Sequence, residues 1–588
     1  MESVIEIKNF SLSFKHHHGL VPAVSDINLT LKKGQTLGLV GESGSGKSVT
    51  SLAIMGLLPF PEAKIISGEI LYQGKDLLKI NQEEFSRIRG SKITMVFQEP
   101  MTSLNPVFNI GNQLMEPLQL HQGLKKKEAF EKAVSLLEEV GLPDPERKIR
   151  DFPHQLSGGQ RQRVMIAMAL ACEPDFMICD EPTTALDVTI QKQVLELLIK
   201  LQKTHQMGLL FISHDLSVVG ELCHEVAVMK KGKLIEKGSA INLFTTPRDP
   251  YTKGLLACRP KLDQNPKRLL TVEDFSQMDD DPNFELPPLK KEIKTEKNFN
   301  HDPKAEPLLK VSHCSVSFPL EERFFGPPKK WFKAVDDISF TLQKGMTLGL
   351  VGESGSGKTT LGRAILQLVK QTQGKIYYRG QCLNDLSKKE MRDLRKKIQI
   401  IFQDPYSSLN PRKTVGELIT TPMTIHNIGT SKKERMELAK ELLQKVGLDP
   451  SHINRYPHQF SGGQRQRISI ARTLSLKPEF IICDESVSAL DVSIQAQVLN
   501  LLQDLQEEFD LTYIFISHDL NVVKYFSDEI IVMKEGKIVE RATPTELYKN
   551  PKSDYTKKLI NSIPKGIEKE NRQKVSFKMG KPSAILSP

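Results

Sequence analysis

One glycine-rich loop directly after a short apolar run constrains the fold of this chain most strongly. The loop is residues 41–48, GESGSGKS, and it follows the run LGLV at 37–40. A phosphate-binding site arises where a strand is followed by a loop that can close around an anion and then by a helix whose N-terminus points at that anion. In such a site Lys47 reaches the β- and γ-phosphates and the Ser48 hydroxyl binds Mg²⁺. The pattern therefore predicts an α/β domain that binds a nucleotide.

The same loop occurs a second time in the chain. Residues 352–359, GESGSGKT, again follow LGLV, and Lys358 lies 311 positions after Lys47. Later landmarks are 304 positions apart, as Ser157 and Ser461 are. A repeat of this length indicates two copies of one domain rather than a solenoid.

The length of the chain, 588 residues, also requires more than one core, because single cores stop growing at roughly 250–300 residues. We expect a first domain at 1–258, a linker at 259–306, a second domain at 307–564 and a basic, poorly ordered tail at 565–588. The linker is rich in Pro, Asp, Glu and Lys and has little periodicity. As a flexible coil it would span about 40 Å, enough for the two halves to pair face to face.

Composition excludes several other classes of protein. Hydrophobic residues make up 39% and charged residues 26%, and no apolar run approaches the ~18 residues of a membrane span. The N-terminus lacks a secretion signal, so we expect the chain in the cytosol. Seven cysteines without C-x-x-C spacing argue against a disulfide scaffold or a zinc site. The net charge of +10 is compatible with binding to nucleic acid, anionic lipid or nucleotide. The three histidines at 16–18 are compatible with an exposed turn or a metal site.

Each half opens with an alternating strand pattern and continues into a helical insertion. The strands place Phe14 and Phe318 upstream of the phosphate loops, where either side chain could stack on adenine or belong to the core. In the insertion, Phe130, Ala133, Leu137 and Val140 fall on one face of an amphipathic helix, and Met436, Ala439, Leu443 and Val446 repeat the pattern.

Three further motifs follow in the same order in both halves. LSGGQRQR at 156–163 and FSGGQRQR at 460–467 offer a hydroxyl and open backbone N–H groups at a helix start. FMICDE at 176–181 and FIICDE at 480–485 predict buried strands that end in two acids, the first suited to Mg²⁺ and the second to orienting or deprotonating a water molecule. ISHD at 212–215 and 516–519 adds a histidine, His214 or His518, for the γ-phosphate.

In this order the motifs resemble the nucleotide-binding domain of ATP-binding-cassette (ABC) proteins, over about 510 of the 588 residues. The resemblance implies tandem P-loop NTPase domains of the α/β class, each a RecA-like core with an antiparallel β subdomain and a helical subdomain. It also implies head-to-tail pairing, in which the phosphate loop of one half and the Ser-Gly-Gly signature of the other hold each ATP.

The motifs and the resemblance together assign the site residues. Expected nucleotide-binding residues of the first half are Phe14, Gly41, Ser43, Gly44, Ser45, Gly46, Lys47, Ser48, Val49, Gln98, Ser157, Gly158, Gly159 and Gln160. Those of the second half are Phe318, Gly352, Ser354, Gly355, Ser356, Gly357, Lys358, Thr359, Thr360, Gln403, Ser461, Gly462, Gly463 and Gln464. The expected Mg²⁺ ligands are Ser48, Gln98 and Asp180, and Thr359, Gln403 and Asp484; the expected catalytic residues are Glu181, His214, Glu485 and His518. The substitutions at Phe460 and Ser486-Val487 remove no catalytic group, so both sites are expected to hydrolyse ATP.

A narrower resemblance is to the ATPase subunits of peptide importers, the oligopeptide, dipeptide, nickel and glutathione class. It rests on QEPMTSLNP at 98–106, QDPYSSLNP at 403–411, DPYTK at 249–253 and DYTK at 554–557. It implies two membrane permeases as partners, docked near Gln98 and Gln403, an extracytoplasmic solute-binding protein, and a peripheral position on the cytoplasmic face of the cell membrane. Some relatives carry an iron–sulfur cysteine cluster after the terminal motif, but here only Cys258 is present, so no cluster is expected. The alternative is a soluble tandem ABC ATPase that acts on ribosomes or nucleic acid.

Overall fold

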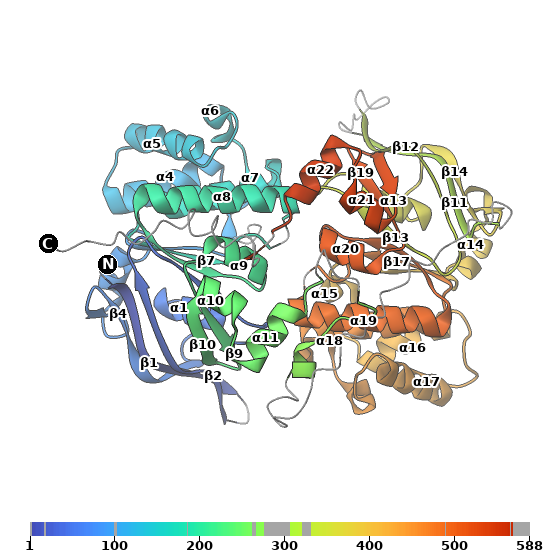
Figure 1. Ribbon diagram of the computed structural model, residues 1–588, viewed down its shortest axis with the longest axis horizontal. Coiled ribbons are helices and arrows are strands. Elements are labelled where there is room, and N and C mark those ends of the chain that lie inside the picture. Colours follow the sequence, from blue (N-terminus) through green and yellow to red (C-terminus); the bar gives the residue numbers. More distant parts are fainter. Residues whose placement is uncertain are drawn as a thin grey trace.

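The computed structural model describes residues 3–16, 19–98, 103–184, 186–260, 266–275, 306–319, 331–488, 490–564 and 566–567. The chain forms two copies of one three-part unit, which lie side by side in Figure 1. Each copy has a six-stranded sheet, a four-stranded sheet and a group of helices. The predicted fold class, tandem P-loop domains with β and helical subdomains, is confirmed.

The elements of the two halves follow the same order along the chain. First-half strands are β1 (Ser3–His16), β2 (Gly19–Lys32), β3 (Thr36–Val40), β4 (Ala63–Tyr72), β5 (Lys75–Asp76), β6 (Ile93–Val96), β7 (Phe176–Asp180), β8 (Gly208–Ile212), β9 (Glu225–Lys230) and β10 (Lys233–Ser239). First-half helices are α1 (Lys47–Ile54), α2 (Gln82–Ile88), α4 (Ile110–Gln122), α5 (Lys126–Glu139), α6 (Pro145–Lys148), α7 (Gly158–Leu170), α8 (Val188–His205), α9 (Leu216–Leu222), α10 (Ala240–Thr245) and α11 (Pro250–Ala257).

Second-half strands are β11 (Leu309–Pro319), β12 (Trp331–Leu342), β13 (Thr347–Val351), β14 (Gln373–Tyr378), β15 (Gln381–Cys382), β16 (Ile398–Ile401), β17 (Phe480–Asp484), β18 (Thr512–Ile516), β19 (Glu529–Lys534) and β20 (Lys537–Ala542). Second-half helices are α13 (Lys358–Ile365), α14 (Lys388–Leu394), α15 (Pro405–Ser408), α16 (Val415–Ile425), α17 (Lys432–Lys445), α18 (Gly462–Leu474), α19 (Val492–Phe509), α20 (Leu520–Phe526), α21 (Pro544–Lys549) and α22 (Asp554–Asn561).

The six-stranded sheet positions the predicted motifs. Its order is β10-β9-β3-β8-β7-β6, and β3, β6, β7, β8 and β9 run parallel. Every residue of β3, β7 and β8 is buried, as expected for strands covered on both faces. Ligands of open parallel sheets bind beyond the carboxyl ends of the strands, and the phosphate loop, the acid pair and the histidine all follow such ends. The second half repeats this sheet with β13, β17 and β18.

The other two parts of each half flank this sheet. The antiparallel sheet has the order β2-β1-β4-β5 in the first half and β12-β11-β14-β15 in the second. The helical part contains α4, α5 and α7, or α16, α17 and α18. Ala133, Leu137, Ala439 and Leu443 are fully buried on α5 and α17, so the predicted amphipathic faces are confirmed.

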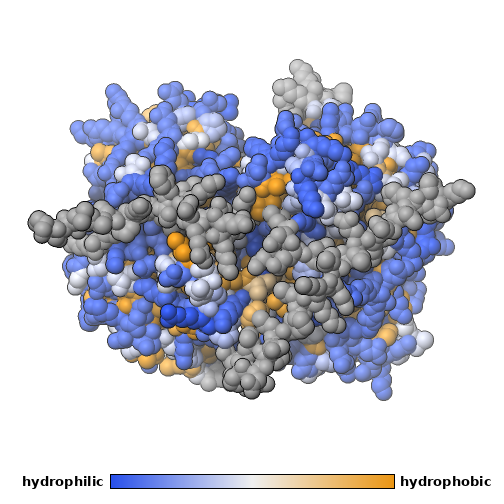
Figure 2. Space-filling model, in the orientation of Figure 1, coloured by the Kyte–Doolittle hydropathy of each residue, from blue (hydrophilic) through white to orange (hydrophobic). Residues whose placement is uncertain are grey.

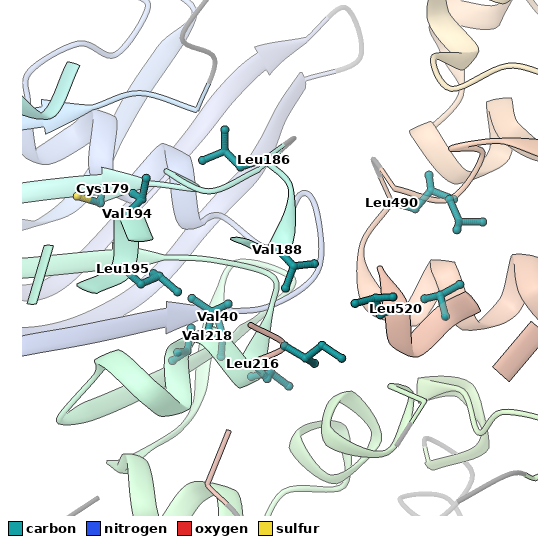
Figure 3. Packing of buried hydrophobic residues seen from close by; sticks show 14 of the residues in the cluster. Val40, Cys179, Leu186, Val188, Val194, Leu195, Leu216, Val218, Leu490 and Leu520 are labelled. Carbon is teal, nitrogen blue, oxygen red and sulfur yellow. The ribbon is translucent and has the colours of Figure 1, made fainter. Parts of the chain in front are cut away.

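The two halves contact each other through reciprocal elements. Helix α11 packs on α19 of the second half, and α22 packs on α8 of the first, where Lys192 Nζ donates to the Asn561 carbonyl at 3.0 Å. Near the centre, Leu186 and Val188 face Leu490 and Leu520 (Figure 3). These residues line a cavity of about 90 Å³ between the halves. The helical parts lie at opposite corners of the molecule (Figure 1).

Part of the expected linker is packed rather than extended. Leu269, Val272 and Phe275 are each at most 6% exposed. The backbone of Leu269 exchanges two hydrogen bonds with the buried Asn500 side chain on α19, at 3.0 and 2.9 Å. Val272 and Phe275 lie against Gly254 of α11, so the segment packs between α11 of the first half and α19 of the second, and burial of its apolar side chains stabilises this position. Residues 276–305, the larger part of the linker, lie outside the described residues, as does nearly all of the expected tail.

Within the described part of the chain, no helix combines the length and the apolar character that crossing a bilayer requires. The face drawn in Figure 2 is mostly hydrophilic, and its hydrophobic residues form small patches.

Candidate functional site

The phosphate loop of the first half joins β3 to α1 in a conformation that only glycine accommodates. Gly46 caps α1 with a φ of 101°, in the left-handed region. A Cβ on Gly41 would lie 2.2 Å from the backbone oxygen of Met229. Ser45 beside them has a buried hydroxyl without a hydrogen-bond partner among the described residues. A closed loop with an unused buried donor fits an anionic ligand.

Lysine side chains lie across both loops. Lys47 Nζ donates to the carbonyl oxygens of Gly41 and Glu42 at 2.8 and 2.9 Å. Lys358 makes the corresponding bonds to Gly352 and Glu353 at 2.8 and 2.9 Å. An ammonium group has three donors. Lys47 uses two of them in these bonds, and Lys358 also donates to Ser356 Oγ at 3.4 Å, so each loop holds its lysine in a fixed position.

A hydroxyl and a carboxylate meet beside each loop, as the sequence predicts for a magnesium site. Ser48 Oγ donates to Asp180 Oδ1 at 3.3 Å, and Thr359 Oγ1 to Asp484 Oδ1 at 2.9 Å. Burial raises the pKa of Asp180 to about 6 and raises the pKa of Asp484 as well. A cation would offset this cost of burying charge, and hard oxygen donors of this kind suit Mg²⁺.

The second acid of each pair is held by the predicted glutamine and histidine. In the first half, Gln98 Nε2 donates to Glu181 Oε2 at 2.9 Å, and His214 Nδ1 lies 3.2 Å from the same oxygen. In the second half the corresponding distances to Glu485 Oε2 are 2.8 Å from Gln403 and 3.4 Å from His518. Both carboxylates are thus oriented through one oxygen.

The backbone of these glutamates is strained in the same way in both halves. Glu181 and Glu485 have φ angles of 49° and 48°, which non-glycine residues adopt at a cost of about 1–3 kcal/mol. Each N–H donates to the strand carbonyl of Ile212 or Ile516, at 2.9 and 3.0 Å. The strand bonds hold the turn that directs each carboxylate toward its histidine.

Electrostatics keep these glutamates ionised. Burial alone would raise the pKa of Glu181, but the hydrogen bond and charge of His214 lower it to about 2. Burial would lower the pKa of His214, and the bond and charge of Glu181 raise it instead. Glu485 and His518 shift in the same directions for the same reasons. Each pair therefore favours the ionised form of the glutamate and the protonated form of the histidine.

The signature motifs begin α7 and α18, as predicted. Ser157 and Ser461 are the N-caps, and their hydroxyls accept from the backbone N–H of Gln160 and Gln464 at 3.3 and 3.4 Å. A Cβ on Gly159 would lie 2.5 Å from Ile190 on α8, so glycine permits this close packing. Both serines are exposed, and among the described residues the cap bond is the only hydrogen bond of each side-chain hydroxyl, which leaves the hydroxyl accessible from solvent.

An aspartate from each half reaches the phosphate loop of the other. Asp491 Oδ2 accepts from the Ser43 N–H at 2.8 Å, and Asp187 Oδ2 accepts from the Ser354 N–H at 3.4 Å. The Ser493 hydroxyl also donates to the Glu42 carboxylate. The site prediction omitted Asp187 and Asp491, although the sequence shows both at the same place, six residues after Glu181 and Glu485.

A tyrosine from the terminal motif of each half also contacts the phosphate loop, and sequence reasoning assigned it no role. The Tyr251 hydroxyl on α11 accepts from the Glu42 N–H at 3.1 Å and donates to the Glu42 carboxylate at 3.3 Å. The Tyr555 hydroxyl on α22 accepts from the Glu353 N–H at 3.0 Å. Recurrence of a Tyr-Thr-Lys sequence after each β10-type strand is the signal that could have identified the pair.

Several predicted residues are not joined to these clusters by a hydrogen bond or ion pair within the described chain. Phe14 packs partly against the core of its half, whereas Phe318 is 40% exposed on β11. Cys258 is fully buried, and burial raises its pKa to about 12. The roles of these residues stay predictions, and Glu99 to Thr102 of the importer-like segment lie outside the described residues.

Two phosphate loops on parallel sheets, each beside a hydroxyl–carboxylate pair and a histidine-held glutamate, define a tandem P-loop ATPase. Comparison with known proteins refines this class. Residues 24–184 and 335–488 match the family described as "ABC transporter", and residues 235–279 and 539–585 match "Oligopeptide/dipeptide transporter, C-terminal region". The chain therefore belongs to the ABC transporter family and, as a member, binds and hydrolyses ATP.

Relatives match nearly the whole chain. The glutathione import ATP-binding protein of Salmonella paratyphi A is 46% identical over 95% of this chain and 89% of its own length. The peptidoglycan transport ATP-binding protein of Agrobacterium fabrum is 45% identical over 95% of this chain and 96% of its own. Among solved structures, a dimeric ATP-binding cassette in a post-hydrolysis state with ADP and Pi is 30% identical over 40% of this chain and 98% of its own length, with a TM-score of 0.37.

Proposed function

We propose that this chain is the ATP-hydrolysing motor subunit of an importer for peptides or related small solutes such as dipeptides, oligopeptides or glutathione. The observation that carries this proposal is the pair of oligopeptide/dipeptide transporter C-terminal regions, one after each ATPase core. The names of the similar proteins, a glutathione importer and a peptidoglycan transporter subunit, support the same class of cargo. They do not favour the alternative of a factor acting on ribosomes or nucleic acid.

The motor works through membrane permeases, which are the partners that importer ATP-binding subunits require. The chain binds two permease subunits from the cytoplasmic face of the cell membrane, and through them serves an extracytoplasmic solute-binding protein. Each permease docks in the groove between a core sheet and its helical part. A cavity of about 390 Å³, lined by Phe402 just before Gln403 and lying between β16, α16 and α18, supports this position in the second half.

ATP lies between the two halves, which pair head to tail within one chain. Lys47, Ser48 and Gln98 bind the first ATP with Ser461, Gly463 and Gln464 from the other half. Lys358, Thr359 and Gln403 bind the second with Ser157, Gly159 and Gln160. The hydrogen bonds from Ser43 to Asp491 and from Ser354 to Asp187 support this arrangement, because each joins a phosphate loop to the loop ahead of the opposite α8-type helix.

The two acids of each pair have different roles in ATP hydrolysis. Asp180 and Asp484, with the adjacent hydroxyls and the glutamine amides, would hold Mg²⁺, which would supply positive charge beside the transferring phosphate. Glu181 and Glu485 are ionised and oriented, so each can hold a water molecule in line with the γ-phosphate and accept its proton. The histidines hold these carboxylates in place. With ATP bound, they also contact the γ-phosphate. No iron–sulfur cluster takes part.

The experiment that tests this function is co-expression with the candidate permeases. The chain should move from the cytosolic to the membrane fraction only when both permeases are present, and its ATPase rate should respond to the solute-loaded binding protein. A chain that stays with cytosol or ribosomes in the presence of the permeases contradicts the transporter role.

A further inference from the structure

The second-half groove carries two cations that form no ion pair with the residues that the structure describes. Arg472 on α18 and Lys413, just before α16, both line the cavity beside Gln403. Arg472 donates to the Ser408 carbonyl, and Lys413 Nζ donates to Thr421 Oγ1 at 3.4 Å. Within the described chain, no carboxylate lies within 4.0 Å of either cation; Glu417 interacts with Lys413 only at longer range.

These charges lie against an apolar wall. Ile400, Phe402, Leu418 and Pro422 line the same cavity. Burial lowers the pKa of Arg472, with no acidic group opposing the shift. A cation that is partly desolvated without a counter-charge is costly, and a carboxylate brought by a partner would relieve this cost. The groove therefore fits a segment that presents both apolar side chains and an acid.

The first half has different residues at the sequence positions that correspond to these. Gln98 and Gln403 are 305 positions apart, so Lys413 corresponds to Phe108 and Thr421 corresponds to Glu116. After the Ser-Gly-Gly signature the offset is 304, so Arg472 corresponds to Met168. Phe108 is 51% exposed and the preceding Val107 is 71% exposed, so both present apolar surface to solvent. Glu116 on α4 is exposed and forms no ion pair with the described residues.

The two halves thus differ in charge at corresponding positions. The second has two cations where the first has two apolar side chains, and the first has an acid where the second has a threonine. A carboxylate that binds Lys413 and Arg472 would meet Phe108, Met168 and the like charge of Glu116 in the other groove. Like-charge contact and desolvated unpaired charge are the means by which interfaces reject a wrong partner.

We propose that the two grooves select two different permease segments, one with an aspartate or glutamate for the second half and an apolar one without a facing acid for the first. This inference rests on the proposed docking of permeases. It means that the chain binds a heteromeric pair of permeases in one orientation, and that the difference between the two halves fixes the orientation.

Photo-cross-linking in the full chain tests the assignment. A benzoylphenylalanine side chain replaces Thr421 in one variant and Glu116 in another, each expressed in its own host, and mass spectrometry identifies the cross-linked segments. Position 421 should cross-link one permease at a segment containing an acid, and position 116 should cross-link the other permease. Cross-linking of the same segment from both positions overturns the inference but leaves permease docking intact.

Charge reversal is the second arm of the test. Lys413→Glu should lower the cross-linking yield at position 421 by at least about tenfold, equivalent to about 1.4 kcal/mol, without changing the yield at position 116. Phe108→Glu is the matched control and should have the reverse effect. Lys413→Gln should give a smaller loss than Lys413→Glu, and all three variants should keep the parent ATPase rate without permeases. Unchanged yields with Lys413→Glu refute the charge assignment, and absence of any membrane protein at either position refutes the docking function itself.

Discussion

Removing one hydroxyl group should weaken ATP binding at the first phosphate loop more than at the second. Tyr251→Phe deletes a hydroxyl that bonds both the backbone N–H and the carboxylate of Glu42. Tyr555→Phe deletes a single bond to the N–H of Glu353. The two mutations are chemically identical, so the difference between them isolates the extra bond.

The magnitudes follow from the kinds of hydrogen bond. A neutral bond contributes about 0.5–1.5 kcal/mol and one to a charged group about 1.5–3 kcal/mol. Since both bonds of Tyr251 are long, at 3.1 and 3.3 Å, we expect a loss of about 2 kcal/mol there and about 1 kcal/mol at Tyr555. If all of this free energy is lost from the ordering of the phosphate loop that binds ATP, the affinity for ATP falls roughly thirtyfold at the first site and roughly fivefold at the second.

The assay is titration with a fluorescent ATP analogue in chains that keep one working phosphate loop. Lys358→Ala leaves only the first loop for Tyr251→Phe, and Lys47→Ala leaves only the second for Tyr555→Phe. Tyr513→Phe is the control, because Tyr513 is also fully buried but bonds the Leu502 carbonyl away from the loops. It should lower the unfolding temperature without changing ATP affinity.

The outcome that refutes this reasoning is specific. If Tyr251→Phe lowers thermal stability as Tyr513→Phe does and leaves the affinity for ATP unchanged, the tyrosine only supports the fold. An effect of Tyr555→Phe as large as that of Tyr251→Phe would show that the bond to the Glu42 carboxylate contributes nothing.

Three further predictions concern the catalytic clusters. Glu181→Gln and Glu485→Gln should each retain ATP binding and each lower turnover at least about tenfold, about 1.4 kcal/mol in the barrier; a normal rate in one of them means that its site does not hydrolyse ATP in the parent. Ser461→Arg should block hydrolysis at the site built on Lys47 if that site is completed by the other half, and single-turnover hydrolysis of ATP cross-linked at that site measures this directly. His214→Gln should lower the free energy of unfolding most between about pH 4.5 and 6.5. The raised pKa of His214 gives stability that is fully present below pH 6.5 and is lost as pH rises through the folded-state pKa, and the lowered pKa of Glu181 gives stability that is lost as pH falls from 4.5 toward 2. Melting temperatures that fall equally at pH 5.5 and pH 9 would contradict the ion pair.

The sequence alone determined the parts of each site whose residues are close together in the chain. The loop at 41–48, the serine caps of α7 and α18 and the acid pairs at strand ends have the predicted local structure. Glycine freedom at positive φ, capping hydroxyls and apolar strands act over a few residues, so a short motif contains the whole cause of its conformation. The duplication then predicted two sheets with the same order of motifs.

Only the tertiary structure decided which distant residues meet. Glu42 and Tyr251 are 209 positions apart, and Ser43 and Asp491 are 448 apart. Lys413 and Arg472 come from separate segments of the second half and reach one groove, and Leu269 of the expected linker packs on α19. Such contacts depend on how whole sheets and helices pack, and their cost in chain entropy is met by burial summed over many residues rather than by any motif. For that reason the sequence predicted what each loop binds, whereas the partners that position the loops and distinguish the two halves became visible only in the folded chain.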